Sequence, residues 1–194
     1  MVDIIAVTYG QNEILKCFIN SIKSQTNNNW RLVIIHDGPN PTLHNELKNE
    51  GYLNSDKIEF IEHPIRTEHY GHLLRKWSLE NVIKNEYVLL TNGDNYYMPT
   101  MVDEVSKRNE DLIYFDLIHS HKTPFNSNGS TYGLMNSQLV SSKVDMGNVV
   151  IKSELAKKVG FNSVAFNADW IYFTEVLKLS PSIFKIDKVL FVHN

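Results

Sequence analysis

Residues 3–118 alternate short apolar runs with stretches of helical periodicity, and this alternation restricts the chain to few folds. Short apolar runs predict strands, and apolar residues three and four positions apart predict helices. The predicted strands cover 3–8, 31–35, 58–61, 87–90 and 112–118, and the helices cover 12–23, 43–48, 73–83 and 101–108. Successive strand–helix units give parallel strands joined by right-handed crossovers. The sequence therefore predicts an α/β fold with a Rossmann-like, mostly parallel central sheet and helices on both faces.

The second part of the chain is less regular. Residues 119–143 are rich in Ser, Asn, Gly and Thr and show no periodicity. A long irregular stretch favours a substrate-facing loop that orders on binding, with a passive insertion as the alternative. After it, 146–151 and 188–192 are predicted as strands, and 153–159 and 169–179 as helices.

Length and composition fit a single domain over residues 1–194, and an abrupt end after the last apolar run also fits a fragment of a longer protein. The formal net charge of -3 argues against a nucleic-acid partner. No signal peptide or integral membrane segment is predicted, so a cytoplasmic location is expected. Cys17, the single cysteine, fits a reducing compartment and is predicted to fill the core.

Three predicted strands end in polar residues, at 8–13, 36–38 and 92–94. The carboxyl ends of parallel strands share one edge of a sheet, where open α/β folds bind ligands. A carboxylate between amides, as at Asp94, suits a hard divalent cation that bridges to a phosphate. The alternative for 92–95 is a tight Asn-Gly turn between strand and helix.

Five segments, in this order, resemble glycosyltransferase family 2, whose members have the GT-A fold. The first three are the strand end at 5–13, the helix that follows it with residues 18–25, and the strand at 30–38. Residues 89–95 stand where the family has its Asp-x-Asp metal motif. Residues 159–170, which contain Asn-Ala-Asp-Trp, stand where it has its Glu-Asp motif. The resemblance covers nearly the whole chain. It implies transfer of a sugar from a nucleoside-diphosphate donor, with UDP favoured, to a glycan or other hydroxyl acceptor.

The resemblance also implies roles for particular residues. The residues expected to bind the donor are Thr8, Tyr9, Glu13, Asp37, Arg75, Asn92 and Gly93. Asp94 and His193 would bind Mn²⁺ or Mg²⁺, Gly147 would allow the donor sugar to come close, and Trp170 would stack on the acceptor. Asp169 would be the general base of a transfer with inversion. Purely structural readings stay open for several of them. Glu13 and Asp169 suit the first turn of a helix without any ligand, Asp37 suits a turn, and Trp170 suits a core.

Two residues depart from the family pattern. Asn92 replaces the first Asp of Asp-x-Asp, and Ala168 replaces the Glu of Glu-Asp. An amide oxygen binds a hard cation more weakly than a carboxylate does. The leading hypothesis is thus a metal-dependent glycosyltransferase, and the alternative is a non-catalytic nucleotide-sugar or glycan-binding protein. A nucleotidylyltransferase is disfavoured because 8–13 contain no Lys or Arg to hold a triphosphate.

Overall fold

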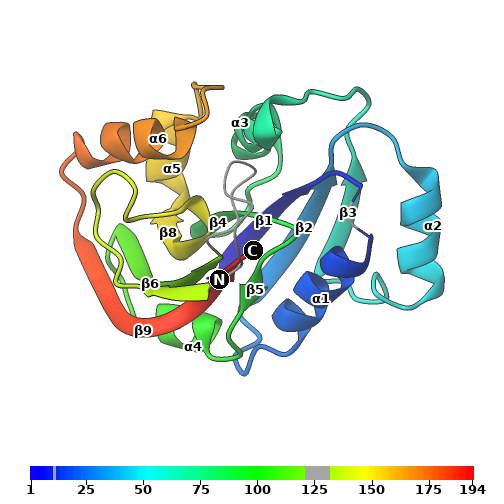
Figure 1. Cartoon of the computed structure of the whole chain (residues 1–194), viewed down its shortest axis with the longest axis horizontal. Coiled ribbons are helices and arrows are strands. Elements are labelled where there is room, and N and C mark those ends of the chain that lie inside the picture. Colours follow the sequence, from blue (N-terminus) through cyan, green and yellow to red (C-terminus); the bar gives the residue numbers. More distant parts are fainter. Residues whose placement is uncertain (11, 121–131) are drawn as a thin grey trace.

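The computed structural model describes residues 1–10, 12–120 and 132–194 and shows a curved sheet with helices on both faces (Figure 1). The strand order is β3-β2-β1-β4-β8-β6-β9-β5, and β7 pairs with β6. The strands are β1 (Val2–Thr8), β2 (Trp30–His36), β3 (Ile58–Glu62), β4 (Tyr87–Asn92), β5 (Tyr96–Tyr97), β6 (Leu112–Ser120), β7 (Tyr132–Met135), β8 (Val149–Lys152) and β9 (Ile183–His193). The helices are α1 (Asn12–Lys23), α2 (Pro41–Asn49), α3 (His72–Asn81), α4 (Met101–Ser106), α5 (Ser153–Val159) and α6 (Ala168–Leu177), with single 3₁₀ turns η1 (His69–Gly71) and η2 (Met146–Asn148). The predicted fold class is confirmed.

The strands β3, β2, β1 and β4 form a parallel half-sheet. All residues of β1 are buried, as expected for a strand covered on both faces. Thr8 of β1 lies beside His36 of β2, and Val7 lies beside Asn92 of β4. The polar residues that follow these strands therefore meet at one edge of the sheet, as the sequence predicted.

The other half of the sheet is mixed and differs from a simple strand–helix alternation. Strand β8 lies between β4 and β6 and runs antiparallel to both, whereas β6 and β9 are parallel. Local periodicity identifies strands but carries no information on their order across the sheet. The insertion of β8 brings the residues before it, and the end of β9, to the same edge as Asn92.

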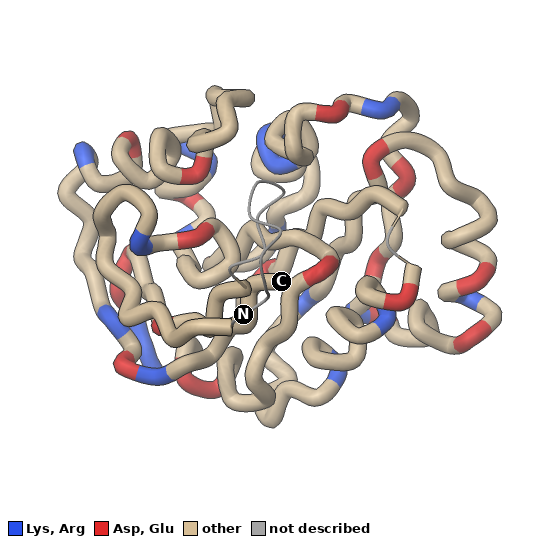
Figure 2. The backbone as a smooth tube through the Cα atoms, in the orientation of Figure 1, with Lys and Arg blue, Asp and Glu red and all other residues tan. Residues whose placement is uncertain are grey.

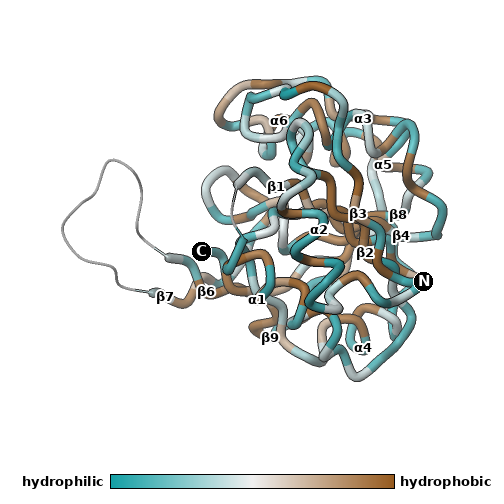
Figure 3. Tube along the Cα trace, turned by 90° about the vertical axis from the view of Figure 1, so that its right-hand side faces the viewer, coloured by the Kyte–Doolittle hydropathy of each residue, from teal (hydrophilic) through white to brown (hydrophobic). Residues whose placement is uncertain are grey.

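Two hydrophobic clusters hold the layers together, one on each face of the sheet. One joins the sheet to α1, α2 and α4, and the other joins it to α3, α5 and α6. Neighbouring residues of β1 alternate between them, Ile4 facing the first cluster and Ile5 the second. Figure 3 shows the hydrophobic residues concentrated along the inner strands.

Four local predictions need correction. Cys17 is exposed, because α1 instead buries Lys16, whose ammonium pairs with Glu13, Glu46 and Glu50. Residues 146–148 form a 3₁₀ turn ahead of β8 and are not part of the strand. The short strand β5 was not predicted. The expectation of irregular structure over 119–143 is wrong for β7, and its 121–131 part lies outside the described residues.

In the described part of the chain, no helix combines the length and apolar character needed to cross a membrane. Lys and Arg are interspersed with Asp and Glu over the described residues (Figure 2).

The buried carboxylate of Asp3 ties the start of β1 to the chain entering β4. It accepts hydrogen bonds from the backbone N–H groups of Lys84 (2.6 Å) and Asn85 (2.9 Å), from Asn85 Nδ2 (2.7 Å) and from Arg31 Nη1 (3.1 Å). Four donors on one side chain make it a structural clamp for the centre of the sheet.

Asp3→Ala should lower the free energy of unfolding by about 3 kcal/mol, because it leaves these buried donors without an acceptor. Urea denaturation measures the change. Asp187→Ala is the control, since that carboxylate is 83% exposed and should cost little. Equal effects of the two substitutions would contradict the clamp.

Candidate active site

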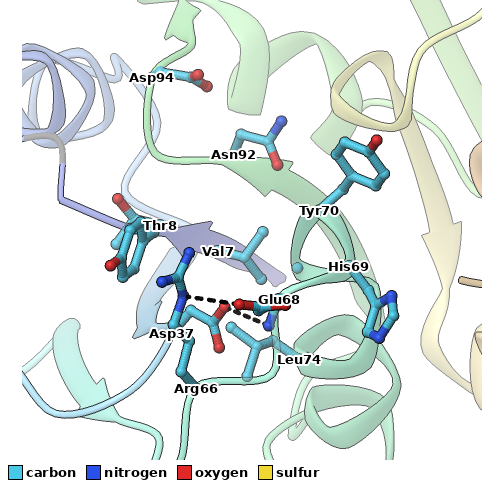
Figure 4. Close-up of a pocket in the computed structure, with 12 residues that line it drawn as sticks. Val7, Thr8, Asp37, Arg66, Glu68, His69, Tyr70, Leu74, Asn92 and Asp94 are labelled. Atoms are coloured by element: carbon cyan, nitrogen blue, oxygen red, sulfur yellow. Dashed lines mark hydrogen bonds and ion pairs between the residues drawn. The ribbon is translucent and has the colours of Figure 1, made fainter. Parts of the chain in front are cut away.

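A cavity of about 660 Å³ opens at the carboxyl edge of β1, β2 and β4. Its volume is within the range of small-molecule and cofactor sites. It is lined by Val7, Thr8, Tyr9, Asp37, Arg66, Glu68, His69, Tyr70, Gly71, Leu74, Asn92 and Asp94. Figure 4 shows Asn92 and Asp94 on one side and Asp37, Arg66 and Glu68 on the other. All three predicted strand ends contribute to this cavity.

An aromatic and cationic wall forms where β1 and β2 end. The Tyr9 ring is half exposed, lies 5.8 Å from the His36 ring, and carries the Arg66 guanidinium 4.1 Å from its centroid. Planar aromatic and guanidinium groups both stack on heterocycles. This wall therefore suits a nucleobase. No motif or periodicity in the sequence identifies Arg66 as a site residue, because it lies in an irregular segment.

The carboxylate of Asp37 anchors the segment that borders the cavity. It accepts hydrogen bonds from Thr67 N (2.6 Å), Thr67 Oγ1 (2.8 Å) and Glu68 N (2.9 Å). A carboxylate has about four acceptor positions, so about one remains for a base or ribose. Anchoring is thus a role of Asp37 that the sequence did not reveal.

Arg75 is a buried cation behind the cavity. Its guanidinium donates to the carbonyl oxygen of Tyr70 (2.9 Å), to His72 Nδ1 (3.1 Å) and to the amide oxygen of Asn92. Burial lowers the pKa of Arg75, whereas the negative charges of three carboxylates raise it; in decreasing order these belong to Asp169, Asp145 and Asp94. Arg75 therefore both holds these three groups by hydrogen bonds and places a positive charge near three carboxylates.

His72, the first residue of α3, belongs to the same buried group as Arg75. It is buried, and burial followed by the Arg75 charge lowers its pKa to about 4. Because Nδ1 accepts from Arg75, the proton of the neutral ring is on Nε2. Its ring lies 5.2 Å from that of Phe161.

Asp169 lies in the first turn of α6, and its Oδ1 atom is buried without a hydrogen-bond partner among the described residues. Burial raises its pKa to about 6; Arg75 opposes the shift and Asp145 adds to it. A carboxyl group with a pKa close to neutrality is a strong candidate for a general base.

Asp145 is a site residue that the sequence reading missed. Its Oδ1 accepts from Gly147 N (2.8 Å), its backbone N–H donates to Asn148 Oδ1 (2.9 Å), and its Oδ2 lies 3.6 Å from His193 Nε2. The Asp-x-x-Asn spacing is a capping-box signal that could have located this turn. His193 itself ends β9 and stacks on His119, with ring centroids 4.6 Å apart.

Four other predicted site residues make contacts within the protein that account for them without any ligand. Glu13 is outside the cavity lining and pairs with Lys16 (3.0 Å), and Trp170 packs against the second hydrophobic cluster. A Cβ on Gly93 would lie 2.9 Å from Leu15 Cδ1, and one on Gly147 would lie 2.5 Å from Phe191 Cζ. Both glycines are therefore required by the packing of the chain itself.

Few of the described side chains are placed to coordinate a divalent metal ion. Among the described residues, no group of three or more His, Cys, Asp or Glu side chains could hold a metal ion. The carboxylate of Asp94 lines the cavity, and His193 is at the same edge of the sheet. Mg²⁺ and similar ions are commonly bound by one or two carboxylates together with substrate phosphates. The residues present fit a metal that binds jointly with a diphosphate.

Comparison with known proteins defines the fold class. No protein-family model matches the chain. An uncharacterized glycosyltransferase of Methanocaldococcus jannaschii, MJ1057, is 24% identical over 131 residues, which are 67% of this chain and 44% of that protein. Residues 1–349 of Staphylococcus aureus TarS are similar with a TM-score of 0.74 at 15% identity, covering 100% of this chain and 60% of that one. The mannosyltransferase PcManGT of Pyrobaculum calidifontis gives a TM-score of 0.70 at 12% identity, covering 99% and 56%.

The chain has a GT-A-type fold, so the resemblance seen in the sequence is confirmed for the fold. It spans 44% of MJ1057, 60% of TarS residues 1–349 and 56% of PcManGT.

Gly147→Ala should destabilise the protein by about 1–3 kcal/mol in the absence of any ligand, because the methyl group overlaps Phe191. Urea denaturation measures this change. Phe191→Leu removes the obstructing ring atoms, so the double variant should be less destabilised than the sum of the two single variants. Unchanged stability of Gly147→Ala would show that the glycine is not needed for packing.

Proposed function

We propose that this protein transfers a sugar from a nucleoside-diphosphate donor to a hydroxyl group, with Asp169 as general base. The observation that carries the proposal is the joint position of Asp169, Asp145 and Asp94 around the buried Arg75 cation, beside a cavity of nucleotide size. The GT-A-type fold supports it, because it is the fold of the glycosyltransferases compared above.

The donor is proposed to be a UDP-sugar. TarS has been crystallised with UDP and with UDP-GlcNAc, and PcManGT with GDP-Man and Mn²⁺. In this chain the base would stack against the wall of Tyr9 and Arg66, and Thr8 and Asp37 would meet the base or ribose. Arg66 offers the cavity a positive group, which suits the diphosphate.

Asp169 removes the proton of the acceptor hydroxyl. The acceptor oxygen forms a bond to the anomeric carbon, the bond from that carbon to the diphosphate oxygen breaks, and UDP leaves with the electron pair. Attack from the side opposite the leaving group inverts the anomeric configuration. The raised pKa of Asp169 strengthens it as a base. Arg75 holds the Asn92 amide and the Tyr70 carbonyl in place while its charge favours the negative charge that develops on the leaving group.

Asp94, with His193, would hold Mn²⁺ or Mg²⁺ against the donor diphosphate. The ion would supply Lewis-acid stabilisation of the leaving phosphate. The amide oxygen of Asn92 accepts a hydrogen bond from Arg75, so Asp94 is the carboxylate available to the ion at this strand end.

A non-catalytic nucleotide-sugar or glycan-binding protein is the second candidate function. Two observations favour it: Ala168 is fully buried in the second hydrophobic cluster, and Asn92 contributes no charge to the site. Such a protein would bind the donor without releasing nucleotide from it.

Asp169→Asn tests the two candidates. Wild-type protein incubated with a panel of UDP-sugars and Mn²⁺ should release UDP from at least one of them, with water as acceptor, and the variant should be slower by about 10²–10⁴-fold. Release by the wild type should fall as the pH drops below about 6, where Asp169 takes up a proton. Equal release by both proteins would remove Asp169 from catalysis, and no release by the wild type would favour the binding protein.

Asp169→Asn, which should slow UDP release, should also make the folded protein more stable. The pKa of Asp169 is raised from 3.8 to about 6 by folding, so its ionisation disfavours the folded state as the pH rises through this interval. Asp169→Asn should thus be more stable than the wild type at pH 7, with the difference growing between pH 4 and pH 6. Thermal unfolding measures it, and a less stable variant at pH 7 would contradict the burial argument.

A further inference from the structure

Two exposed aromatic rings meet beside Asp169, and neither has a role in the transfer step described above. Tyr70 is 68% exposed and Phe166 is 81% exposed, and their ring centroids lie 5.9 Å apart at an interplanar angle of 79°. They come from separate parts of the chain, the η1 turn before α3 and the segment before α6. We call this pair the Tyr70–Phe166 platform.

The backbone under Tyr70 is held in an unfavourable conformation. Glu68, His69, Tyr70 and Gly71 all have positive φ, and Tyr70 itself has φ 55° and ψ 22°. Residues other than glycine rarely adopt this region, and they persist in it where surrounding contacts impose it, commonly at functional sites. Here the contacts are the Asp37 carboxylate on Glu68 N and the Arg75 guanidinium on the Tyr70 carbonyl.

The Phe166 side of the platform is fixed to the same buried unit. Phe161 is buried and stacks on His72, which accepts a hydrogen bond from Arg75. Ala168 N donates to the carbonyl of Ala165 (2.9 Å), and this turn connects Phe166 directly to the start of α6. Arg75 thus holds the backbone of Tyr70, and Phe166 lies three residues before Asp169 in the segment that leads into α6.

The chemistry of the surroundings points to a sugar ring. The segment 160–168 contains no charged residue, and the residues on either side of Phe166, Ala165 and Asn167, are exposed. The electron-rich face of an aromatic ring attracts the weakly positive C–H bonds on one face of a hexose. Neighbouring amides can donate to and accept from hydroxyl groups.

The platform is also continuous with the donor cavity, because Tyr70 lines it. Figure 4 shows Tyr70 pointing to the side of Asn92 and away from Asp37 and Glu68. A ligand seated on the platform would lie next to the cavity and next to the proposed base.

We infer that the Tyr70–Phe166 platform binds a pyranose ring of the acceptor, so that the acceptor is a glycan. This inference rests on the proposed function and deepens it by assigning the acceptor class.

Saturation-transfer NMR can test this with UDP, Mg²⁺ and octyl β-glycosides of glucose, galactose, mannose and N-acetylglucosamine below their micelle concentrations. Mg²⁺ replaces Mn²⁺ because it is diamagnetic. Ring protons of at least one glycoside should receive saturation from the wild type. The signal should fall about three- to tenfold in Phe166→Ala and in Tyr70→Asn, since asparagine tolerates the same backbone conformation. Ile183→Ala is the control, because this exposed residue starts β9 at the opposite edge of the sheet.

The uracil protons of UDP in the same tube report the donor cavity separately. Three results would overturn the platform: equal ring-proton signals in wild type and Phe166→Ala, saturation confined to the octyl chain, or no glycoside signal while UDP gives one. Ring-proton saturation that depends on Phe166 without any UDP signal would keep the platform as a sugar site and refute the proposed donor.

Discussion

The buried guanidinium of Arg75 is the interaction on which the candidate site depends. Removing a cation from water is costly, and the negative charges of Asp169, Asp145 and Asp94 offset part of this cost, although burial still lowers the pKa of Arg75 on balance. Its hydrogen bonds reach two separate pieces of chain, the junction of η1 and α3 at Tyr70 and His72, and the end of β4 at Asn92. One side chain thus connects the end of β4, the η1 turn and the start of α3, and its charge reaches the start of α6.

This arrangement explains why the site contains both strain and perturbed ionisation. Asp37 and Arg75 hold the positive-φ run from Glu68 to Gly71 by hydrogen bonds to its backbone. The burial that raises the pKa of Asp169 is the same burial that makes Arg75 necessary. In the proposed reaction, Asp169 with its raised pKa removes the proton from the acceptor hydroxyl, and the charge of Arg75 stabilises the departing diphosphate. The cost in stability is what active sites commonly show.

Much of the fold and half of the site could be predicted from the sequence. Thr8, Asp37 and Asp94 follow apolar runs, so their common edge follows from the parallel order of β2, β1 and β4 alone. Asp145 could not be found this way, because it reaches the site only through the antiparallel insertion of β8 between β4 and β6. Arg66, Tyr70 and Phe166 lie in irregular segments, where no periodicity reports direction. Lys16 and Cys17 show the same limit on a helix, since three carboxylates from α1, α2 and the residue after α2 decide which side chain is buried.

The central claim is that the cavity between β1, β2 and β4 binds a nucleoside diphosphate together with a metal. The most direct measurement is the melting temperature with UDP, GDP, dTDP and CMP, each with and without Mn²⁺. A ligand that binds only the folded state stabilises it by RT ln(1 + [L]/Kd), so the melting temperature rises with ligand concentration and affinity. We expect that UDP stabilises the protein, that Mn²⁺ enlarges the effect, and that Asp94→Asn removes the enlargement. Absence of stabilisation by every nucleotide, with and without Mn²⁺, would contradict the claim.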